Sequence, residues 1–382
     1  MNLIIAGDFC PYSRVQSFLE ENKFEKIVSK DVVNLFSKMD YSIVNLECPV
    51  IESKDSNIDK VGPSIKTTSK AFDFLNYLNV NIVTLSNNHI MDYGEKGLVS
   101  SIKGCKDASI EYVGAGFNLA EAREPLFISD ENQKVAIVNI TENEFSTTHD
   151  CYPGANPLDL VNNYYDIKNA KENSDYVIVI YHGGHEGYKY PSPRMKKVFR
   201  YFIDVGADLV VCHHAHCHSG YEVYKNKNIY FGLGNFIFDW PSINNKPWNY
   251  GYFIEINTLT NKIDIHPYSQ SGEALTLTLL KDQEKLNFFD DLELLNKVIQ
   301  DDDKLNTEFS IFTSKRLRSY LSALQPYPGY LLSGAYRKGV LPNLLSKPKI
   351  LRQLNMIRCE AHRDIYMASL KMQLNHKIYN GK

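Results

Sequence analysis

Short apolar runs alternate with helical patterns through the first two thirds of the chain. The runs have the length and the β-branched character of strands and cover 3–6, 43–46, 81–85, 135–139, 176–181, 208–212, 229–233 and 252–256. Apolar residues three or four positions apart predict helices over 31–39, 69–78, 95–107 and 192–205. Strands that alternate with helices are typical of a layered α/β domain. The later strands lack helices between them, which predicts a mixed sheet.

The pattern changes past about residue 265. An Asp-rich helical stretch over 290–304 is followed by a basic region that prolines interrupt. We therefore expect one domain over 1–265 and a helical, basic C-terminal extension over 266–382. Apolar residues at helical spacing from Ile350 to Ala368 predict one long amphipathic helix in that extension.

Charge is distributed unevenly along the chain. Residues 311–382 carry thirteen Lys and Arg against two acidic residues, a net charge of +11, which leaves −14 for residues 1–310. The basic extension fits a face for acidic membrane lipid, a clamp for a polyanionic polymer, a lid on the acidic body, or a helical cap whose basic face is only solvated. The acidic body argues against a nucleic-acid partner.

The N-terminal segment and the cysteines predict a cytoplasmic protein. The first apolar stretch ends at Asp8 after four residues, so it indicates a first strand and not an export signal. The seven cysteines are dispersed and form no CxxC pair, unlike a disulfide framework. No run approaches the roughly eighteen apolar residues that a membrane span needs. We expect a cytoplasmic protein that contacts the inner face of the membrane through its basic C-terminal region.

Polar residues of metal-binding types follow most of the predicted strands. They are Asp8, Asn45 with Glu47, Asn87 and Asn88 with His89, His182 with His185 and Glu186, and His213, His214 and His216. Functional groups gather at the carboxyl ends of strands in α/β sheets, and carboxylate, imidazole and amide groups bind divalent metals. Six of the eleven histidines lie within 182–218, a density that chance seldom produces. In an extended segment His214 and His216 would point the same way and His213 to the other side.

These motifs, in this order, resemble the CapA family, which is named for bacterial capsule and poly-γ-glutamate synthesis. The motifs are Gly7-Asp8, Asn45-Leu46-Glu47, Asn87-Asn88-His89 with Asp92, His182-x-Gly-x-Glu186, His214-x-His216 and Gly234-Asn235-Phe236. The resemblance covers roughly residues 1–258. The family domain is similar to calcineurin-like metallophosphoesterases. This implies a metallophosphoesterase-like layered αββα sandwich with a helical C-terminal extension.

The resemblance also implies two divalent metal ions, Mn, Zn or Fe, bridged by Glu47. One ion would be held by Asp8, Glu47 and His216, and the other by Glu47, Asn88, His182 and His214. Two such ions lower the pKa of a bound water and clamp a phosphoryl oxygen. His89 would then protonate the leaving oxygen. Cys10 replaces the histidine of the phosphoesterase pattern, and we do not count it as a ligand.

Further candidates surround this ligand set. Glu186 is a base, a ligand or an orienting group for an imidazole, or else a solvated loop carboxylate. Asp92 either holds the ring of His89 or caps the following helix. Arg14 and Lys66 are candidate cations for an anionic substrate, although exposed surface cations are the commoner role. The remaining candidates for substrate binding are Asn45 and Asn235.

The sequence favours a metal-dependent hydrolase or transferase of a phosphoester or related bond in capsular or surface polysaccharide biosynthesis. Its substrate would be an anionic sugar, a nucleotide-sugar or a lipid-linked glycan. One alternative is a non-catalytic polymer-binding or assembly subunit. The presence of His89 argues against this alternative, because a protein that only binds polymer does not need a general acid. The other is a metal-dependent phosphodiesterase or nuclease, which would show a dependence on nucleic-acid length and salt.

Overall fold

The computed structural model describes residues 1–52, 57–240, 242, 246–272 and 275–380. The chain divides into two compact units, Met1–Phe309 and Ser310–Lys382. The first unit ends later than the boundary expected at residue 265, because the elements that follow pack on it. Strand β15 (Lys262–Ser269) pairs with β14 (Tyr250–Asn257), and helix α9 (Asp282–Gln300) contributes Phe288 and Leu292 to the core.

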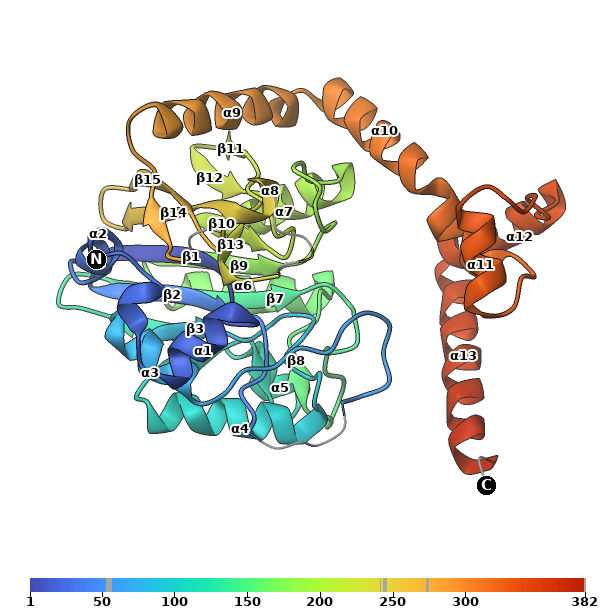
Figure 1. The fold of residues 1–382 in the computed structure, drawn as a ribbon, viewed down its shortest axis with the longest axis horizontal. Coiled ribbons are helices and arrows are strands. Elements are labelled where there is room, and N and C mark those ends of the chain that lie inside the picture. The colour runs from blue at the N-terminus through green and yellow to red at the C-terminus, as the bar shows by residue number, and fades with distance from the viewer. Residues whose placement is uncertain (53–56, 241, 243–245, 273–274, 381–382) are drawn as a thin grey trace. The chain divides into compact units, whose positions relative to one another are not determined.

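Two mixed sheets form the centre of the first unit (Figure 1). The larger sheet has the order β16-β15-β14-β1-β2-β3-β4, with β13 beside β1, and the second has the order β11-β12-β10-β9-β7-β6. Strands β1 to β4 are parallel and β14 is antiparallel to β1, which confirms the mixed sheet. The other strands of the larger sheet are β1 (Asn2–Cys10), β2 (Tyr41–Leu46), β3 (Ile82–Thr84), β4 (Glu111–Val113), β13 (Asn235–Phe238) and β16 (Thr278–Leu279). Those of the second are β6 (Leu126–Ser129), β7 (Lys134–Thr141), β9 (Tyr176–His182), β10 (Leu209–His213), β11 (Tyr221–Tyr224) and β12 (Lys227–Tyr230), while β5 (Ala115–Gly116) pairs with β8 (Gly154–Ala155).

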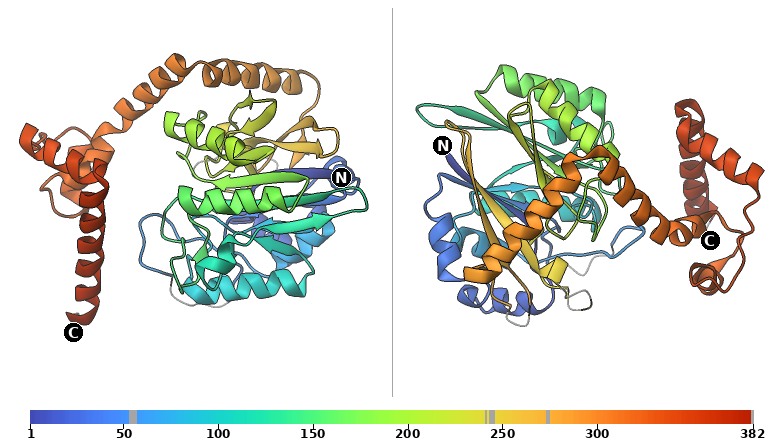
Figure 2. Two further views of the ribbon diagram at one scale, coloured as in Figure 1. Left: turned by 180° about the vertical axis from the view of Figure 1, so that it is seen from behind. Right: turned by 90° about the horizontal axis from the view of Figure 1, so that it is seen from above.

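Helices cover the outer faces of both sheets, as expected for an αββα sandwich. Seen from above in Figure 2, α6 and α7 lie on one side of the strands and the N-terminal helices on the other. Helices α6 (Leu160–Glu172) and α7 (Pro193–Val205) cover the second sheet. The larger sheet is covered by α1 (Arg14–Glu20), α2 (Lys30–Phe36), α3 (Lys70–Tyr77) and α4 (Gly94–Asp107). Short helices are η1 (Phe24–Lys26), α5 (Leu119–Arg123) and α8 (Lys246–Asn249).

The core follows the alternation of side chains along the strands. In β1, Leu3 and Ile5 belong to the cluster between the sheets, whereas Ile4 and Ala6 belong to the cluster under the helices. Successive strand residues point to opposite faces, so a strand buried on both faces reads as a continuous apolar run. This is why the apolar runs of the sequence located the central strands.

The second unit is helical within the described residues. Its elements are the C-terminal part of α10 (Asp302–Leu321), η3 (Ser322–Leu324), α11 (Gly329–Arg337), α12 (Lys347–Arg358) and α13 (Glu360–Asn380). The prediction of one continuous helix from Ile350 to Ala368 is wrong. Cys359 is extended (φ −83°, ψ 119°), so α12 ends before it and α13 begins after it. None of the described helices combines the length and apolarity needed to cross a bilayer.

Candidate metal centre

Three parallel strands of the larger sheet and two of the second sheet bring their carboxyl ends to one buried centre. Asp8 lies within β1 near its end, Glu47 follows β2, and Asn88 follows β3. From the second sheet, His182 ends β9 and His214 follows β10. These are the strand ends expected to converge, and the two facing sheets supply the geometry that joins them.

The first group of candidate ligands is Asp8, Glu47 and His216. One ligand atom from each lies within 4.8 Å of the others. His216 Nδ1 lies 3.6 Å from Asp8 Oδ2, and His216 Nε2 lies 3.6 Å from Glu47 Oε1. All three side chains are buried, so water does not compete freely for these atoms.

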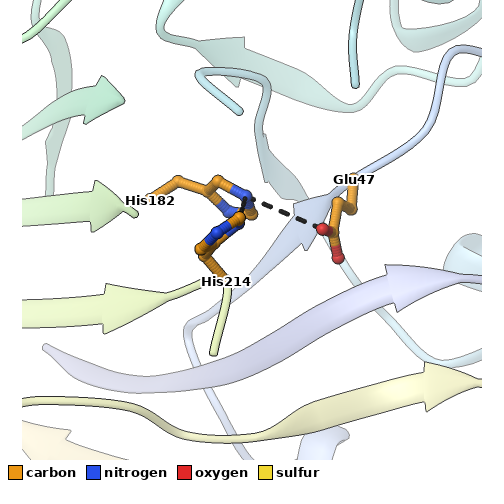
Figure 3. Close-up of side chains that lie close together, drawn as sticks. All are labelled: Glu47, His182 and His214. Atoms are coloured by element: carbon orange, nitrogen blue, oxygen red, sulfur yellow. Dashed lines mark hydrogen bonds and ion pairs between the residues drawn. The ribbon is translucent and has the colours of Figure 1, made fainter. Parts of the chain in front are cut away.

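The second group is Glu47, His182 and His214, which point toward one another in Figure 3. His182 Nε2 lies 3.6 Å from Glu47 Oε1 and 3.2 Å from His214 Nδ1. The amide oxygen of Asn88 lies 3.0 Å from His182 Nε2, so it joins this group. Glu47 thus belongs to both groups, as the resemblance implied.

The carboxylate of Glu47 lies at the centre without a hydrogen bond to any described residue. It is 0% exposed, and neither of its oxygens has a hydrogen-bond partner. Burial, and next the charge of Asp8, raise its pKa well above the usual 4.5. A buried carboxylate without partners is costly, and a cation between the two groups would offset that cost. The donor set of carboxylate, imidazole and amide fits a divalent ion.

The histidines of the centre are held as neutral imidazoles, the form that binds metals. Burial lowers the pKa of His182 well below 6.5, and neighbouring imidazoles lower it further. The pKa of His214 falls to about 3 for the same reasons, and burial also lowers that of His216. These groups could therefore hold metal ions.

The backbone around the histidines differs from the expected extended segment. His214 and His216 have φ of 92° and 53°, in the left-handed region that non-glycine residues rarely adopt. This turn, not strand alternation, aims both imidazoles at the centre. The expectation that His213 faces away is wrong. Its Nδ1 lies 3.8 Å from Asp8 Oδ1, and neither ring nitrogen has a hydrogen-bond partner.

Asn45 and Asn235, which the sequence predicts to bind substrate, hold the candidate ligands in the structure. Asn45 Nδ2 donates to Asp8 Oδ1 at 2.7 Å and lies 3.2 Å from His182 Nδ1. Asn235 Oδ1 lies 2.9 Å from His216 Nδ1, and its amide nitrogen donates to backbone oxygens. Both side chains are at most 1% exposed, and these hydrogen bonds orient the ligands.

His89 is fixed by two charged neighbours, one of which the sequence did not reveal. Its Nδ1 lies 2.7 Å from Asp92 Oδ2, while Asp92 also accepts from the backbone N–H of Ile65. Asp92 therefore holds the ring, and its side chain makes no helix cap. Lys60 forms an ion pair with Asp92, and its Nζ lies 3.1 Å from His89 Nδ1. No local pattern marked Lys60, because it lies on a loop 29 residues before His89.

The other predicted residues lie outside the two ligand groups. Glu186 is exposed, although its charge contributes to the raised pKa of Glu47. The guanidinium of Arg14 is held by Asp239, with Nε donating to Oδ2 at 2.9 Å, which indicates a structural role. Lys66 Nζ lies 5.1 Å from the ring centroid of Tyr93.

Cys10 is buried in a small cluster with Cys48, Ile65, Phe238 and Trp248. Among the described residues it belongs to neither ligand group, in line with our decision not to count it as a ligand.

Known proteins match most of the first unit. The family model for "Bacterial capsule synthesis protein PGA_cap" matches residues 2–240. Capsule biosynthesis protein CapA of Bacillus anthracis is 32% identical over 222 residues, which cover 56% of this chain and 54% of that protein. PGA biosynthesis protein CapA of Bacillus subtilis strain 168 is 29% identical over 237 residues, 61% of this chain and 62% of its own length. The match thus spans little more than half the length of these relatives.

Among solved structures, a novel phosphatase from Mycoplasma pneumoniae is 17% identical with a TM-score of 0.42. That match covers 76% of this chain and 98% of the other.

Proposed function

The chain belongs to the bacterial capsule synthesis protein PGA_cap family, and from this premise we propose that it is a metal-dependent hydrolase or transferase of capsule assembly. The bond it acts on would be a phosphoester or a related acyl or amide bond. The names of two relatives, a PGA biosynthesis protein and a probable polyglutamine synthesis accessory protein of Mycobacterium tuberculosis, support an amino-acid polymer in place of the expected polysaccharide. The substrate would then be an anionic poly-γ-glutamate intermediate.

The observation that carries this proposal is the buried carboxylate of Glu47, which has no hydrogen bond and is shared by the two ligand groups. A purely structural core would replace such a group by an apolar residue, since a buried charge without partners destabilises the fold. We assign one divalent ion to each group, with Glu47 shared. When bound, such a pair of ions lowers the pKa of water and polarises the bond that is attacked.

The residues around the ligands support catalysis over mere binding. Asp92 and Lys60 both engage Nδ1 of His89, so Nε2 is left as the nitrogen that can exchange a proton with a leaving group. A positioned imidazole of this kind typically contributes about 100-fold or more to a rate. A subunit that only bound polymer would not need the ring fixed by two charges.

The test measures turnover and metal content together. Metal-stripped protein is titrated with Mn²⁺ or Zn²⁺ and assayed on a phosphodiester, a phosphomonoester and a γ-glutamyl anilide. We expect metal-dependent turnover that His214→Ala and His89→Ala both abolish. His214→Ala should also lose bound metal, whereas His89→Ala should retain it.

An exposed histidine supplies the control. His149 is exposed, and its ring lies tilted against that of Tyr152 with the centroids 4.8 Å apart, so His149→Ala should change neither turnover nor bound metal. Stoichiometric binding without turnover on any of the three bonds would refute the enzyme and favour the polymer-binding subunit. Activity that rises with nucleic-acid length and falls with salt would instead favour the nuclease.

A further inference from the structure

The helical unit Ser310–Lys382 exposes large apolar side chains within a strongly basic sequence. Tyr330 and Leu331, at the start of α11, are 82% and 84% exposed. Val340 and Ile365 are 74% and 67% exposed. Residues 311–382 also carry the net charge of +11. Soluble surfaces expose single apolar residues routinely, but not large apolar side chains at this density.

On helix α12 the exposed apolar side chains lie on one face. Ile350, Leu351, Leu354 and Ile357 recur at i, i+1, i+4 and i+7, which places them on one face, and they are 42 to 56% exposed. The half-buried side chains of the helix and its C-cap are Gln353, Met356 and Cys359. The helix therefore packs within its unit through a mixed face and leaves its apolar face in water.

Basic groups lie directly beside the apolar ones. The guanidinium carbon of Arg337 lies 5.6 Å from the ring centroid of Tyr330. A surface hollow of about 570 Å³ is lined by Tyr330, Leu331, Arg337 and Lys338, among others. A second hollow brings Arg358 together with Leu351 and Leu354 of α12. Apolar side chains interleaved with cations are typical of helices that lie in the headgroup region of a bilayer.

We propose that this helical unit is a docking surface for a bilayer that contains anionic lipid. The cations complement the lipid headgroups, and leucine, isoleucine and tyrosine side chains enter the boundary between headgroups and acyl chains. A hydrophilic polyanion would use the cations but leave the apolar face in water. A second copy would bring a further +11 charge against the first, which opposes self-association through this unit.

The test uses the full chain and vesicles of two compositions. We expect co-sedimentation with phosphatidylcholine vesicles that contain about 30% phosphatidylglycerol, weak binding to pure phosphatidylcholine, and loss of binding as salt is raised. The double variant Leu331→Glu with Leu354→Glu should bind roughly tenfold more weakly or worse, because it places charge in the acyl boundary. Both positions are exposed, so the fold does not depend on them.

A matched control lies in the first unit. Leu286 and Leu294 on α9 are 58% and 61% exposed, so the double variant Leu286→Glu with Leu294→Glu adds the same charge and should leave vesicle binding unchanged. Equal binding to both vesicle types, no binding to either, or equal loss in this control variant would overturn the proposal. So would a protein that stays off vesicles but binds poly-γ-glutamate, or one that forms a dimer which Leu354→Glu dissociates. Binding retained by Glu47→Gln would show that docking is independent of the metal centre.

Discussion

Gly7→Ala should disturb the metal centre although Gly7 is not a ligand. A Cβ atom at Gly7 would lie 1.8 Å from the carbonyl oxygen of Gly234, far inside van der Waals contact. The same oxygen accepts the backbone N–H of Asp8 at 3.3 Å, and the pairing of β1 with β13 begins at Asp8 and Asn235. The two strands must separate to admit the methyl group. That movement displaces Asp8 and, through Asn235, His216.

The expected cost follows from these contacts. Overpacking contributes about 3 kcal/mol and the lost backbone hydrogen bond about 1 kcal/mol, so the free energy of unfolding should fall by roughly 4 kcal/mol. This is a large share of the 5–15 kcal/mol that is typical of a domain. Urea unfolding measures the free energy, and calorimetric titration with Mn²⁺ should show weakened binding.

Gly334→Ala is the matched control for this change. Gly334 lies within α11, where the nearest atom to the new Cβ among the described residues beyond its own helical turn would be Arg337 Nη2 at 4.0 Å. That variant should be stabilised by about 0.5–1 kcal/mol, because alanine favours the helix, and should bind metal normally. A Gly7→Ala protein with less than about 1 kcal/mol of destabilisation and unchanged metal affinity would refute the reasoning.

Three further predictions concern charge. Burial raises the pKa of Glu47, so the metal-free folded state keeps a proton that the unfolded chain releases above pH 4.5. The stability of wild type relative to Glu47→Gln should therefore fall by about 1.4 kcal/mol per pH unit from pH 4.5 up to the raised pKa of the folded state, measured by urea unfolding, and a flat difference would contradict this. Asp92→Asn should lower turnover about 100-fold with unchanged metal content by elemental analysis, because the ring of His89 loses the negative charge beside Nδ1; an unchanged rate would exclude this role. The hydrogen bond from His218 to Asp291 at 2.8 Å holds the pKa of that carboxyl well below 3.8. Since Asp291 is partly exposed, Asp291→Asn should cost about 1 kcal/mol at pH 7 and progressively less below pH 3.8; an equal cost at low pH would contradict this.

The candidate ligands could be found from the sequence because of where strands end. In parallel strands buried on both faces, the apolar run stops where the chain leaves the sheet, so the polar residue that follows is conspicuous. This signal marked the strand ends at Asp8, Glu47 and His182, and the resemblance to the CapA family selected these residues as ligands. The direction of His214 and His216 was anticipated for an incorrect reason, since their positive φ angles have no local sequence signature.

Roles that depend on distant contacts could not be predicted in the same way. Lys60 reaches Asp92 across a loop, and only the packed structure brings the two together. Asn45 and Asn235 have the composition of substrate-binding residues, but burial directs their amides to the ligands. The predicted boundary at residue 265 lies before the end of the first unit, because α9 carries many charged residues and does not have the pattern of a core helix. Helix α9 packs on the sheets through a few side chains such as Phe288.

Because Glu47 belongs to both ligand groups, binding of a cation at one group would be coupled to binding at the other. A cation at either group would compete with the proton on the buried carboxylate, so it would change the ligand that the other group shares. Two cations near one carboxylate would also repel each other. Whichever effect is larger, the factor by which one ion would change the affinity for the other must be the same in both directions. The two groups would therefore fill as one coupled unit, whose occupancy at a given free metal concentration depends on a coupling energy as well as on the affinity of each group.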